Sequence, residues 1–472
     1  MGEETKDKLK ALKEELAYRP RPVWDQLAEK DKESLERLAA DYRRFLSLAK
    51  TERECVEAIT TLLKKAGFSE RPSARYYTIF REKTLAALVA GKKPPYYGLR
   101  LIATHIDSPR LDLKLHPLYE ELELAFFKTH YYGGIKKYHW VARPLALHGV
   151  VIKPDGSRIK IVLGETPDDP VLTVCDLLPH LARKVQGEKK LSEAIPGEKL
   201  NVLVGGLPLP GDPEEKDRVK LAILKLLHER YGITEEDFVS AELEVVPAGP
   251  AVEVGLDRAF IGGYGQDDRI CAFAALAALL DLQEPEYSTL VIFLDKEEIG
   301  SDGNTGAKSR FLEKLIYDYL KLWGITPQGD TVLEALLRTR AISGDVTAGM
   351  DPHYLEVHEK LNDARMGYGV VLTKYTGHGG KYMANDAHAE YVAWLRRIFS
   401  EARVIYQAAS MGKVDEGGGG TVAKYLAAYG MDIVDLGPPL LGMHSPFEVA
   451  HKADLYMTYQ AYKAFLSAGD SA

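Results

Sequence analysis

Two adjacent glutamates end a stretch of sequence that otherwise predicts a buried strand. The stretch VIFLDKEEIGSDG, from Val291 to Gly303, begins with four apolar residues and then places Glu297 beside Glu298. Neighbouring carboxylates repel each other, so one interpretation is a solvated loop after the strand. If the strand is parallel, however, its carboxyl end lies at the sheet edge where α/β proteins bind ligands. One carboxylate could then face a metal ion and the other a water molecule.

Other residues with metal-binding side chains lie at the ends of predicted elements. His105 occurs in ATHIDSP, two residues before Asp107, and GQDDR places Asp267 and Asp268 directly before an alanine-rich stretch. A histidine at a strand end beside a carboxylate suits a metal ligand, because its second ring nitrogen needs an orienting acceptor. An isolated pair of this kind is more often incidental. The two aspartates could equally cap the helix that follows them.

Two further candidates complete a set whose chemistry suits metal ions. Asp345 follows a short apolar run in ISGDVTAG and His444 lies in LLGMHSPFE, where a turn aspartate and a buried histidine are the alternative interpretations. Two histidines and three carboxylates suit two Zn²⁺-like ions with one bridging carboxylate. Glu297 would then be free to accept a proton from water as a general base. The five candidate ligands are His105, Asp267, Glu298, Asp345 and His444.

The elements that must position these residues follow an alternating pattern of helices and strands. Apolar residues at helical spacing predict helices over 31–50 and 51–68, the second with Thr51 as its N-cap and Gly67 at its end. Residues 98–115 are strand-like. An Ala/Leu helix over 267–282 is followed by a strand over 288–295. This pattern predicts an α/β catalytic region.

From about residue 112 to 250 the pattern changes to strands and loops. The alternating segment HWVARPLALHGVVIKPDGSRIKIVLGE contains Pro-Asp-Gly, which predicts a turn between two strands. An amphipathic helix over 217–232 and an extended segment over 240–255 follow. We therefore predict a discontinuous catalytic domain, 1–111 and 251–472, with a β-rich domain, 112–250, inserted into it.

Composition limits the class of protein. The chain has 472 residues, 46% of them hydrophobic, and a net charge of −8, which argues against nucleic acid or an anionic membrane as a partner. Its three cysteines, Cys55, Cys175 and Cys271, are far apart and predict free, buried thiols in a reducing compartment. The charged stretch MGEETKDKLKALKEEL lacks the apolar region of a signal peptide, and no run of about 18 apolar residues predicts a membrane span. We expect a cytoplasmic protein.

From about residue 70 onward the chain resembles the aspartyl aminopeptidase family of dinuclear metallopeptidases. The resemblance is carried, in family order, by THIDSP, YYGGIKKYHWVARPLALHGVV, GQDDR, DKEEIGS, ISGDVTAGMDPHY and GMHSPFE. It implies that the five candidates above are the metal ligands, that Asp267 bridges the ions, that Asp107 orients His105 and that Glu297 is the base. Here Gln-Asp-Asp replaces the family's Leu-Asp-Asn, so Asp268 remains a rival for Asp267.

The resemblance also implies an architecture, a substrate class and partners. It implies an α/β/α domain of the dinuclear zinc exopeptidase type with a β-rich insertion that builds dimers. The dimers would assemble into a tetrahedral dodecamer. The expected cofactor is two divalent ions per subunit, Zn²⁺ first, with Co²⁺ or Mn²⁺ as alternatives. His180, in LLPHLARK, would reach a neighbouring subunit's site, although an ordinary helix histidine is the alternative. Lys374, in VVLTKYTG, would contact an acidic substrate side chain, although HGGKYMAND beside it departs from the family.

The expected activity is hydrolysis of the first peptide bond of peptides that begin with Asp or Glu. Three alternatives stay open: an aminopeptidase of broad or neutral specificity, a dinuclear carboxypeptidase or deacylase, and a self-assembling scaffold without activity. Substrate end-group preference separates the first two from each other. The scaffold is disfavoured because the chain retains every ligand position and the base. A metal-independent hydrolase is disfavoured because the sequence has no Gly-x-Ser-x-Gly motif.

Overall fold

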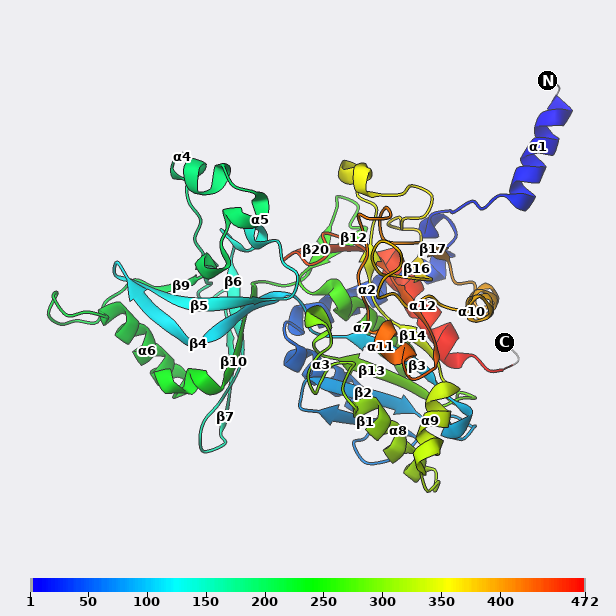
Figure 1. The fold of residues 1–472 in the computed structure, drawn as a ribbon, viewed down its shortest axis with the longest axis horizontal. Coiled ribbons are helices and arrows are strands. Elements are labelled where there is room, and N and C mark those ends of the chain that lie inside the picture. The colour runs from blue at the N-terminus through cyan, green and yellow to red at the C-terminus, as the bar shows by residue number, and fades with distance from the viewer. Residues whose placement is uncertain (1–2, 471–472) are drawn as a thin grey trace.

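The protein, described here by a computed structural model over residues 3–470, is built on three β-sheets (Figure 1). The largest sheet is mixed: β13, β3, β14 and β18 are parallel neighbours, whereas β2 and β16 flank them in the antiparallel sense. In spatial order its strands are β1 (Arg75–Phe80), β2 (Thr84–Val89), β13 (Thr289–Leu294), β3 (Arg100–His105), β14 (Arg340–Ser343), β18 (Asp432–Gly437), β16 (Val370–Thr373) and β17 (Tyr406–Ala408).

Helices cover both faces of this sheet, which gives the predicted α/β/α arrangement. Successive strand residues point to opposite faces, so Val291 and Phe293 pack into one core and Leu290 and Ile292 into the other. The first core is closed by α2 (Glu29–Leu48), α3 (Glu52–Lys65), α7 (Gln266–Leu280), α10 (Ala389–Glu401) and α12 (Lys452–Ser467). The second is closed by α8 (Phe311–Leu322), α9 (Gly329–Leu337) and α11 (Ala423–Ala427).

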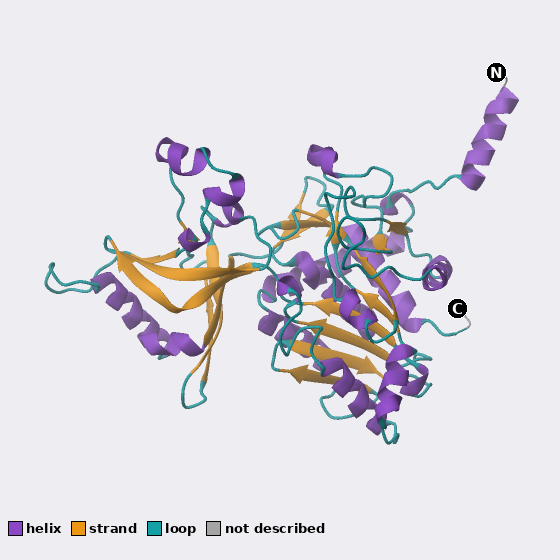
Figure 2. Cartoon of the chain, in the orientation of Figure 1, coloured by secondary structure: helices purple, strands orange, loops and turns teal. Residues whose placement is uncertain are grey.

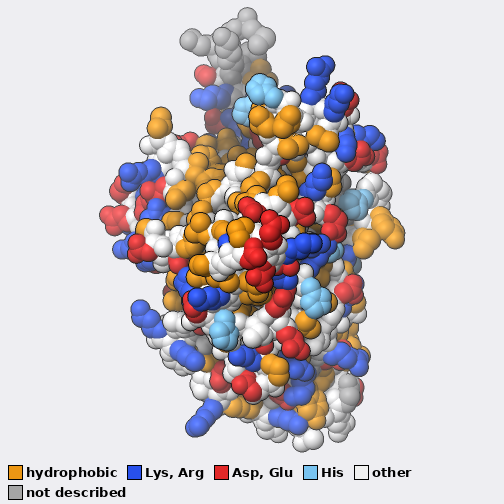
Figure 3. Space-filling model, turned by 90° about the vertical axis from the view of Figure 1, so that its left-hand side faces the viewer, with side chains coloured by type: hydrophobic (Ala, Val, Ile, Leu, Met, Phe, Trp, Pro, Cys, Tyr) orange, Lys and Arg blue, Asp and Glu red, His pale blue; other side chains and the backbone are white. Residues whose placement is uncertain are grey.

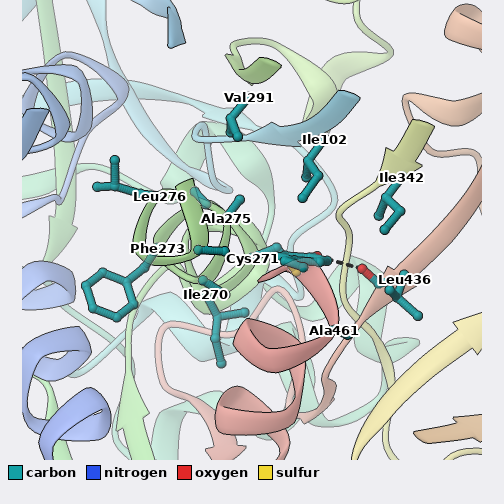
Figure 4. Close-up of a cluster of buried hydrophobic side chains, with 14 of the residues drawn as sticks. Ile102, Ile270, Cys271, Phe273, Ala275, Leu276, Val291, Ile342, Leu436 and Ala461 are labelled. Atoms are coloured by element: carbon teal, nitrogen blue, oxygen red, sulfur yellow. Dashed lines mark hydrogen bonds between the residues drawn. The ribbon is translucent and has the colours of Figure 1, made fainter. Parts of the chain in front are cut away.

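Helix α7 is buried on almost all sides, as its alanine- and leucine-rich sequence predicts. Figure 4 shows Ile270 and Cys271 of this helix among strand residues such as Ile102 and Val291, with Ala461 of α12 beside them. Because small alanines let α7 approach both the sheet and α12, the position of its first turn is fixed at the sheet edge. The predicted helix over 267–282 is thus confirmed, as is the predicted strand over 288–295.

A second, antiparallel sheet stands apart from the first (Figure 2) and has its own core around Trp140, Phe127 and Val245. The predicted Pro-Asp-Gly turn joins two of its strands. In spatial order these are β7 (Arg158–Leu163), β6 (Leu145–Ile152), β10 (Ala241–Pro247), β4 (Arg110–Glu121), β5 (Leu124–Tyr132), β9 (Val202–Gly205) and β8 (Thr173–Val174). Three helices accompany them: α4 (Pro179–Ala182), α5 (Leu191–Ala194) and α6 (Arg218–Tyr231).

The third sheet is small and links the other parts. Its strands, in spatial order, are β11 (Val252–Val254), β12 (Phe260–Gly263), β20 (Glu448–His451), β19 (Pro439–Leu441) and β15 (Thr347–Ala348). Strand β12 leads into α7, and the turn between β19 and β20 contains His444. Helix α1 (Glu3–Leu16) lies away from the sheets (Figure 1). Within residues 3–470 no helix has both the length and the apolar character needed to cross a membrane.

Two local expectations have different outcomes. Thr51 is the N-cap of α3, and its hydroxyl accepts a hydrogen bond from the Glu54 backbone N–H at 3.2 Å, as predicted. All three cysteines are free, and Cys55 and Cys271 are buried, but the prediction of a buried thiol is wrong for Cys175, which is exposed. The physical reason is that Cys175 directly follows β8, a two-residue strand at the end of the second sheet, so nothing covers it from beyond that edge.

Candidate metal centre

Three of the five candidate ligands lie close together because each lies at or just after the end of one of three parallel neighbouring strands. Strand β3 ends at His105, β13 leads through Asp295 and Lys296 to Glu297 and Glu298, and β14 ends two residues before Asp345. Since β13, β3 and β14 are parallel neighbours, their carboxyl ends share one edge of the sheet. Lys296 takes a left-handed conformation and starts a short 3-10 turn, Glu297–Ile299, which sets the two glutamates off from the strand direction.

The other two candidate ligands do not follow strands of the first sheet. Asp267 lies in the first turn of α7, where its backbone departs from helical geometry, and His444 lies in the turn between β19 and β20. The Asp267 carboxylate lies between two histidines: its Oδ1 is 3.2 Å from His105 Nε2, and its Oδ2 is 3.2 Å from His444 Nε2. The folded chain therefore brings together residues that are separated by more than three hundred positions.

The five residues form two overlapping groups, each with ligand atoms close enough for one metal ion. The first group is His105, Asp267 and Asp345, and the second is Asp267, Glu298 and His444. Glu298 Oε2 lies 3.4 Å from His444 Nε2, and Asp345 Oδ1 lies 3.9 Å from His105 Nε2. Asp267 belongs to both groups and Asp268 belongs to neither. The Asp268 carboxylate instead lies 3.4 Å from the backbone N–H of His105.

The charges of this cluster suit divalent cations. Burial, and then the nearby charge of Asp267, raise the pKa of Glu298 well above its usual value, and burial raises the pKa of Asp345 similarly. Although burial opposes its charged form, Glu298 and Asp267 raise the pKa of His444 to about 10. Glu298 Oε1 is buried and has no hydrogen-bond partner among the described residues. Crowded carboxylates, an unpartnered oxygen and imidazole nitrogens form a donor set that fits metal ions of the zinc type.

Glu297 lies in the same cavity but in neither ligand group. The cavity has a volume of about 420 Å³ and is lined by His105, Asp267 and Glu298 as well as by Glu297. Burial raises the pKa of the Glu297 carboxyl to about 7. A carboxyl group with a pKa near neutrality is suited to accept and release protons. The role of general base for Glu297 remains a prediction.

Asp107 connects the first histidine to the glutamate pair. Its Oδ1 lies 3.4 Å from His105 Nδ1 and accepts a hydrogen bond from the backbone N–H of Glu297 at 3.1 Å. Its Oδ2 accepts one from the backbone N–H of Glu298 at 3.2 Å. The backbone carbonyl oxygen of Asp107 lies closer to His105 Nδ1, at 3.2 Å, and accepts its hydrogen bond, which leaves Nε2 facing Asp267; the Asp107 carboxylate holds the turn that carries both glutamates.

Sequence reasoning missed three residues that support the centre. Glu448 accepts hydrogen bonds from the backbone N–H of His444 at 2.7 Å and of Asp267 at 3.1 Å. The hydroxyl of Tyr132 donates to Asp107, and the carbonyl oxygen of Gly134 lies 3.0 Å from His444 Nδ1. All three lie inside motifs that carried the family resemblance, YYGGIKK and GMHSPFE, but their residue types alone gave no reason to assign a role.

Two predicted substrate-binding residues lie outside the set that lines this cavity. Lys374 follows β16, and its ammonium group is 2.6 Å from Asp386 Oδ1, although its neighbours Thr373 and Thr376 do line the cavity. His180 is exposed on α4, on the β-rich side of the molecule away from α7 (Figure 1).

Fold and site together define a metal-dependent hydrolase of the α/β type. The family "Aminopeptidase I zinc metalloprotease (M18)" matches residues 45–466. A probable M18 family aminopeptidase 1 of Thermotoga maritima is 52% identical over 444 residues, which cover 92% of this chain and 96% of that protein. The chain therefore belongs to the M18 family and is a metallo-aminopeptidase, and the resemblance found in the sequence is confirmed.

Solved structures agree with this membership. The crystal structure of an M18 aminopeptidase from Thermotoga maritima superposes with a TM-score of 0.91 at 50% identity, covering 95% of this chain and 99% of that one. Aminopeptidase I from Clostridium acetobutylicum gives a TM-score of 0.90 at 43% identity, covering 96% and 100%. A more distant structure, the mApe1 dodecamer of S. cerevisiae, shares the fold at 21% identity with a TM-score of 0.73, covering 90% and 95%.

Proposed function

We propose that this aminopeptidase uses two divalent metal ions, most simply Zn²⁺, and that Asp267 bridges them. The observation that carries the proposal is that both carboxylate oxygens of Asp267 are engaged, one toward each of two ligand groups. His105 and Asp345 would complete one site, and Glu298 and His444 the other. Divalent ions bound there would supply Lewis acidity toward a peptide carbonyl and lower the pKa of a water molecule.

The residues of the chain carry the proton transfers. Glu297 accepts the proton of the attacking water, whose oxygen bonds to the carbonyl carbon of the first peptide bond. The carbon–nitrogen bond then breaks, and Glu297 delivers the proton to the leaving amine. The same carboxyl group acts first as a base and then as an acid. The Asp107 carboxylate accepts a hydrogen bond from the backbone N–H of Glu297 and so fixes the Glu297 carboxylate within the cavity.

The assay that tests this function compares substrates that have a free amino terminus with the same substrates after N-acetylation. We expect hydrolysis of amino-acid p-nitroanilides, no hydrolysis of N-acetylated versions of the same compounds, and loss of activity in a chelator with recovery on adding Zn²⁺, Co²⁺ or Mn²⁺. Because bound ligands stabilise the folded state, the chelator should also lower Tm. Activity that survives complete metal removal, or preference for the acetylated substrate, would contradict the metallo-aminopeptidase mechanism or favour the deacylase alternative.

We further propose a preference for substrates that begin with Asp or Glu. Lys374 directly follows β16 and lies in the chain between the cavity-lining residues Thr373 and Thr376. Its ammonium group contacts Asp386, which is also 2.7 Å from Lys381, so a substrate carboxylate would take the place of this exposed partner. Lys424 lines the cavity itself and is the natural comparison. A lysine so placed favours a carboxylate over a basic side chain.

Replacing Lys374 by methionine should lower kcat/KM for Asp and Glu substrates by roughly 10- to 150-fold, because a charge-assisted contact contributes about 1.5–3 kcal/mol. A Leu substrate should be much less affected. The measurement is kcat/KM for Asp-, Glu-, Leu- and Lys-p-nitroanilides, with Lys424→Met as the matched variant. Equal cleavage of Leu and Asp substrates by the wild-type enzyme would favour broad or neutral specificity, and a change of preference only in Lys424→Met would transfer the role to that lysine.

We propose that the β-rich region, residues 112–250, joins subunits into a closed homo-oligomer. Hydrophobic side chains gather on the face of the molecule that this region forms (Figure 3), among them the exposed Leu124, Val171 and Leu226. An apolar groove of about 820 Å³ runs between α6 and strands β5 and β9. Contiguous exposed apolar surface is typical of protein–protein contacts. The mApe1 structure, a dodecamer with the same fold, supports this proposal, with a tetrahedral dodecamer as its fullest form.

Light scattering should therefore give a mass several times 52.4 kDa, the mass of one chain. Leu226→Glu should lower the mass because it places a charge in the groove. If His180 enters a neighbouring subunit's cavity, His180→Ala should lower activity without changing the mass. The matched control is His228→Ala, on α6 of the same region. A monomer with full activity would contradict both the assembly and the role of His180.

A further inference from the structure

The last residues of β5 and the two glycines that follow lie against the candidate metal centre. Strand β5 belongs to the second sheet, yet Tyr132 and Gly133 contact residues that follow strands of the first sheet, and Gly134 contacts His444 in the β19–β20 turn of the third sheet. These residues form the YGG part of a motif to which neither the sequence nor the proposed mechanism gives a role. We call residues 132–134 the bridging segment.

Tyr132 supports the residue that holds the glutamate turn. Its hydroxyl donates to Asp107 Oδ2 at 2.7 Å, the same oxygen that accepts the backbone N–H of Glu298. Burial, followed by the charge of Asp107, raises the pKa of Tyr132 well above its usual value, so the hydroxyl keeps its proton and remains a donor. Asp107 therefore receives a hydrogen bond from the second sheet on one side and from the glutamate turn on the other.

A buried arginine fixes the ring of Tyr132 within the second sheet. The guanidinium carbon of Arg110 lies 3.9 Å from the centre of the Tyr132 ring, and Arg110 pairs with Tyr132 in the β4–β5 register. Arg110 Nε lies 3.1 Å from Glu244 Oε2 of β10. Its Nη1 lies 3.4 Å from Glu52 Oε2 of α3, a helix that covers the first sheet. The tyrosine is thus held from both parts of the molecule rather than free to rotate.

Gly134 holds the second histidine. His444 Nδ1 donates to the carbonyl oxygen of Gly134 at 3.0 Å, which leaves Nε2 facing Asp267 and Glu298. A Cβ atom at Gly134 would lie 3.2 Å from His444 Nδ1, and one at Gly133 would lie 3.3 Å from the Cβ of Glu298. Gly133 also has φ +73°, a conformation that favours glycine. Both glycines allow the backbone to approach the centre closely.

We propose that the bridging segment is a positioning element through which the β-rich region sets the geometry of the metal centre. Tyr132 positions Asp107 and hence the turn of Glu297 and Glu298, and the Gly134 carbonyl positions His444. The inference rests on the roles proposed above for Asp107, Glu297, Glu298 and His444. It gives the second sheet a part in catalysis in addition to assembly: a shift of β5 relative to the first and third sheets changes a hydrogen bond to Asp107 and one to His444 together.

Tyr132→Phe tests the first contact by removing one hydroxyl group and keeping the ring. We expect kcat to fall by about tenfold, the lower end of the effect of losing the direct partner of a metal ligand, because Tyr132 acts through Asp107; KM should stay within about twofold of wild type. Metal occupancy at saturating Zn²⁺ should be unchanged. The matched control is Tyr131→Phe, the same change at the exposed neighbouring residue, which should leave kcat unchanged. Tm in chelator, measured for both variants, reports any loss of folding stability separately.

Gly134→Ala tests the second contact with a readout that does not depend on activity. The added methyl group presses on His444, so metal release to a colorimetric chelator should be about tenfold faster than in wild type. Gly187→Ala is the matched control, because a Cβ there meets no atom within 4 Å and the residue lies in the same β-rich region. Its release rate should equal that of the wild type.

Two results would overturn the inference. One is a Tyr132→Phe enzyme whose kcat per metal-loaded subunit equals that of Tyr131→Phe, even if its Tm is lower, since that pattern means a purely structural role. The other is a metal release rate in Gly134→Ala equal to that in Gly187→Ala. If Glu297→Gln is inactive while Tyr132→Phe is fully active, only this inference fails. If Glu297→Gln is active, the proposed function itself fails.

Discussion

Replacing Glu297 by glutamine is expected to lower kcat by about 10²- to 10⁴-fold, the contribution typical of a general base, while the protein keeps its metal ions. Glutamine has nearly the same shape but cannot take a proton from water. Glu297 lies in the cavity and outside both ligand groups, so its loss should leave the ligand sets intact. Metal content by mass spectrometry and kcat on the best p-nitroanilide substrate, measured on the same preparation, test this expectation.

The adjacent residue provides the control for this experiment. Glu298→Gln changes the neighbouring carboxylate, which lies 3.4 Å from His444 and belongs to one ligand group. We expect it to reduce metal occupancy and to regain part of its activity at high metal concentration. If Glu297→Gln is instead the variant that loses metal, the roles of the two glutamates are reversed.

Replacing Asp267 by asparagine should lower kcat/KM by about a thousandfold or more, since each bound ion contributes several kcal/mol to transition-state stabilisation. Asp267 belongs to both ligand groups, so one amide substitution weakens both sites. Asp345→Asn, which changes a residue of one group, should leave the other ion bound. The measurement is the number of ions per subunit after dialysis, together with kcat/KM at increasing Zn²⁺.

Asp268→Asn is the matched control for the bridging aspartate. Asp268 is the next residue, equally buried, and lies in neither group. Its carboxylate contacts only the backbone N–H of His105 among the ligand residues, at 3.4 Å, so we expect normal metal content and at most a modest loss of activity. Loss of both ions in Asp268→Asn, with normal content in Asp267→Asn, would make Asp268 the bridge.

Local pattern was sufficient to predict the elements around the centre. The apolar run before Asp295 predicts β13, the alanine-rich stretch predicts α7, and Thr51 predicts the start of α3. Each prediction rests on periodicity or capping, which the backbone imposes over a few neighbouring residues. The same local reasoning failed for Cys175, because burial depends on what lies across a sheet edge and not on the residue type.

The supporting contacts of the centre could not be predicted in this way. Tyr132, in the second sheet, and Asp107, in the loop after β3 of the first sheet, are 25 positions apart, and Gly134 and His444 are 310 positions apart. Tyrosine and glycine are common residues whose local sequence carries no mark of a distant partner. Only the packing of the second sheet against the first and third sheets brings these groups within hydrogen-bond distance.

The sequence by itself determined the types of the metal-binding residues, their order and the strand ends or helix start at which they lie. The tertiary structure decided which of them lie close enough to share an ion: both oxygens of Asp267 face histidines, whereas Asp268 turns toward the backbone. It also decided that Glu297 remains free of both groups while Glu298 joins one. The physical reason is that chain neighbours have the same chemistry but point in different directions, and those directions are fixed by the turn, helix and parallel strands that meet at one sheet edge.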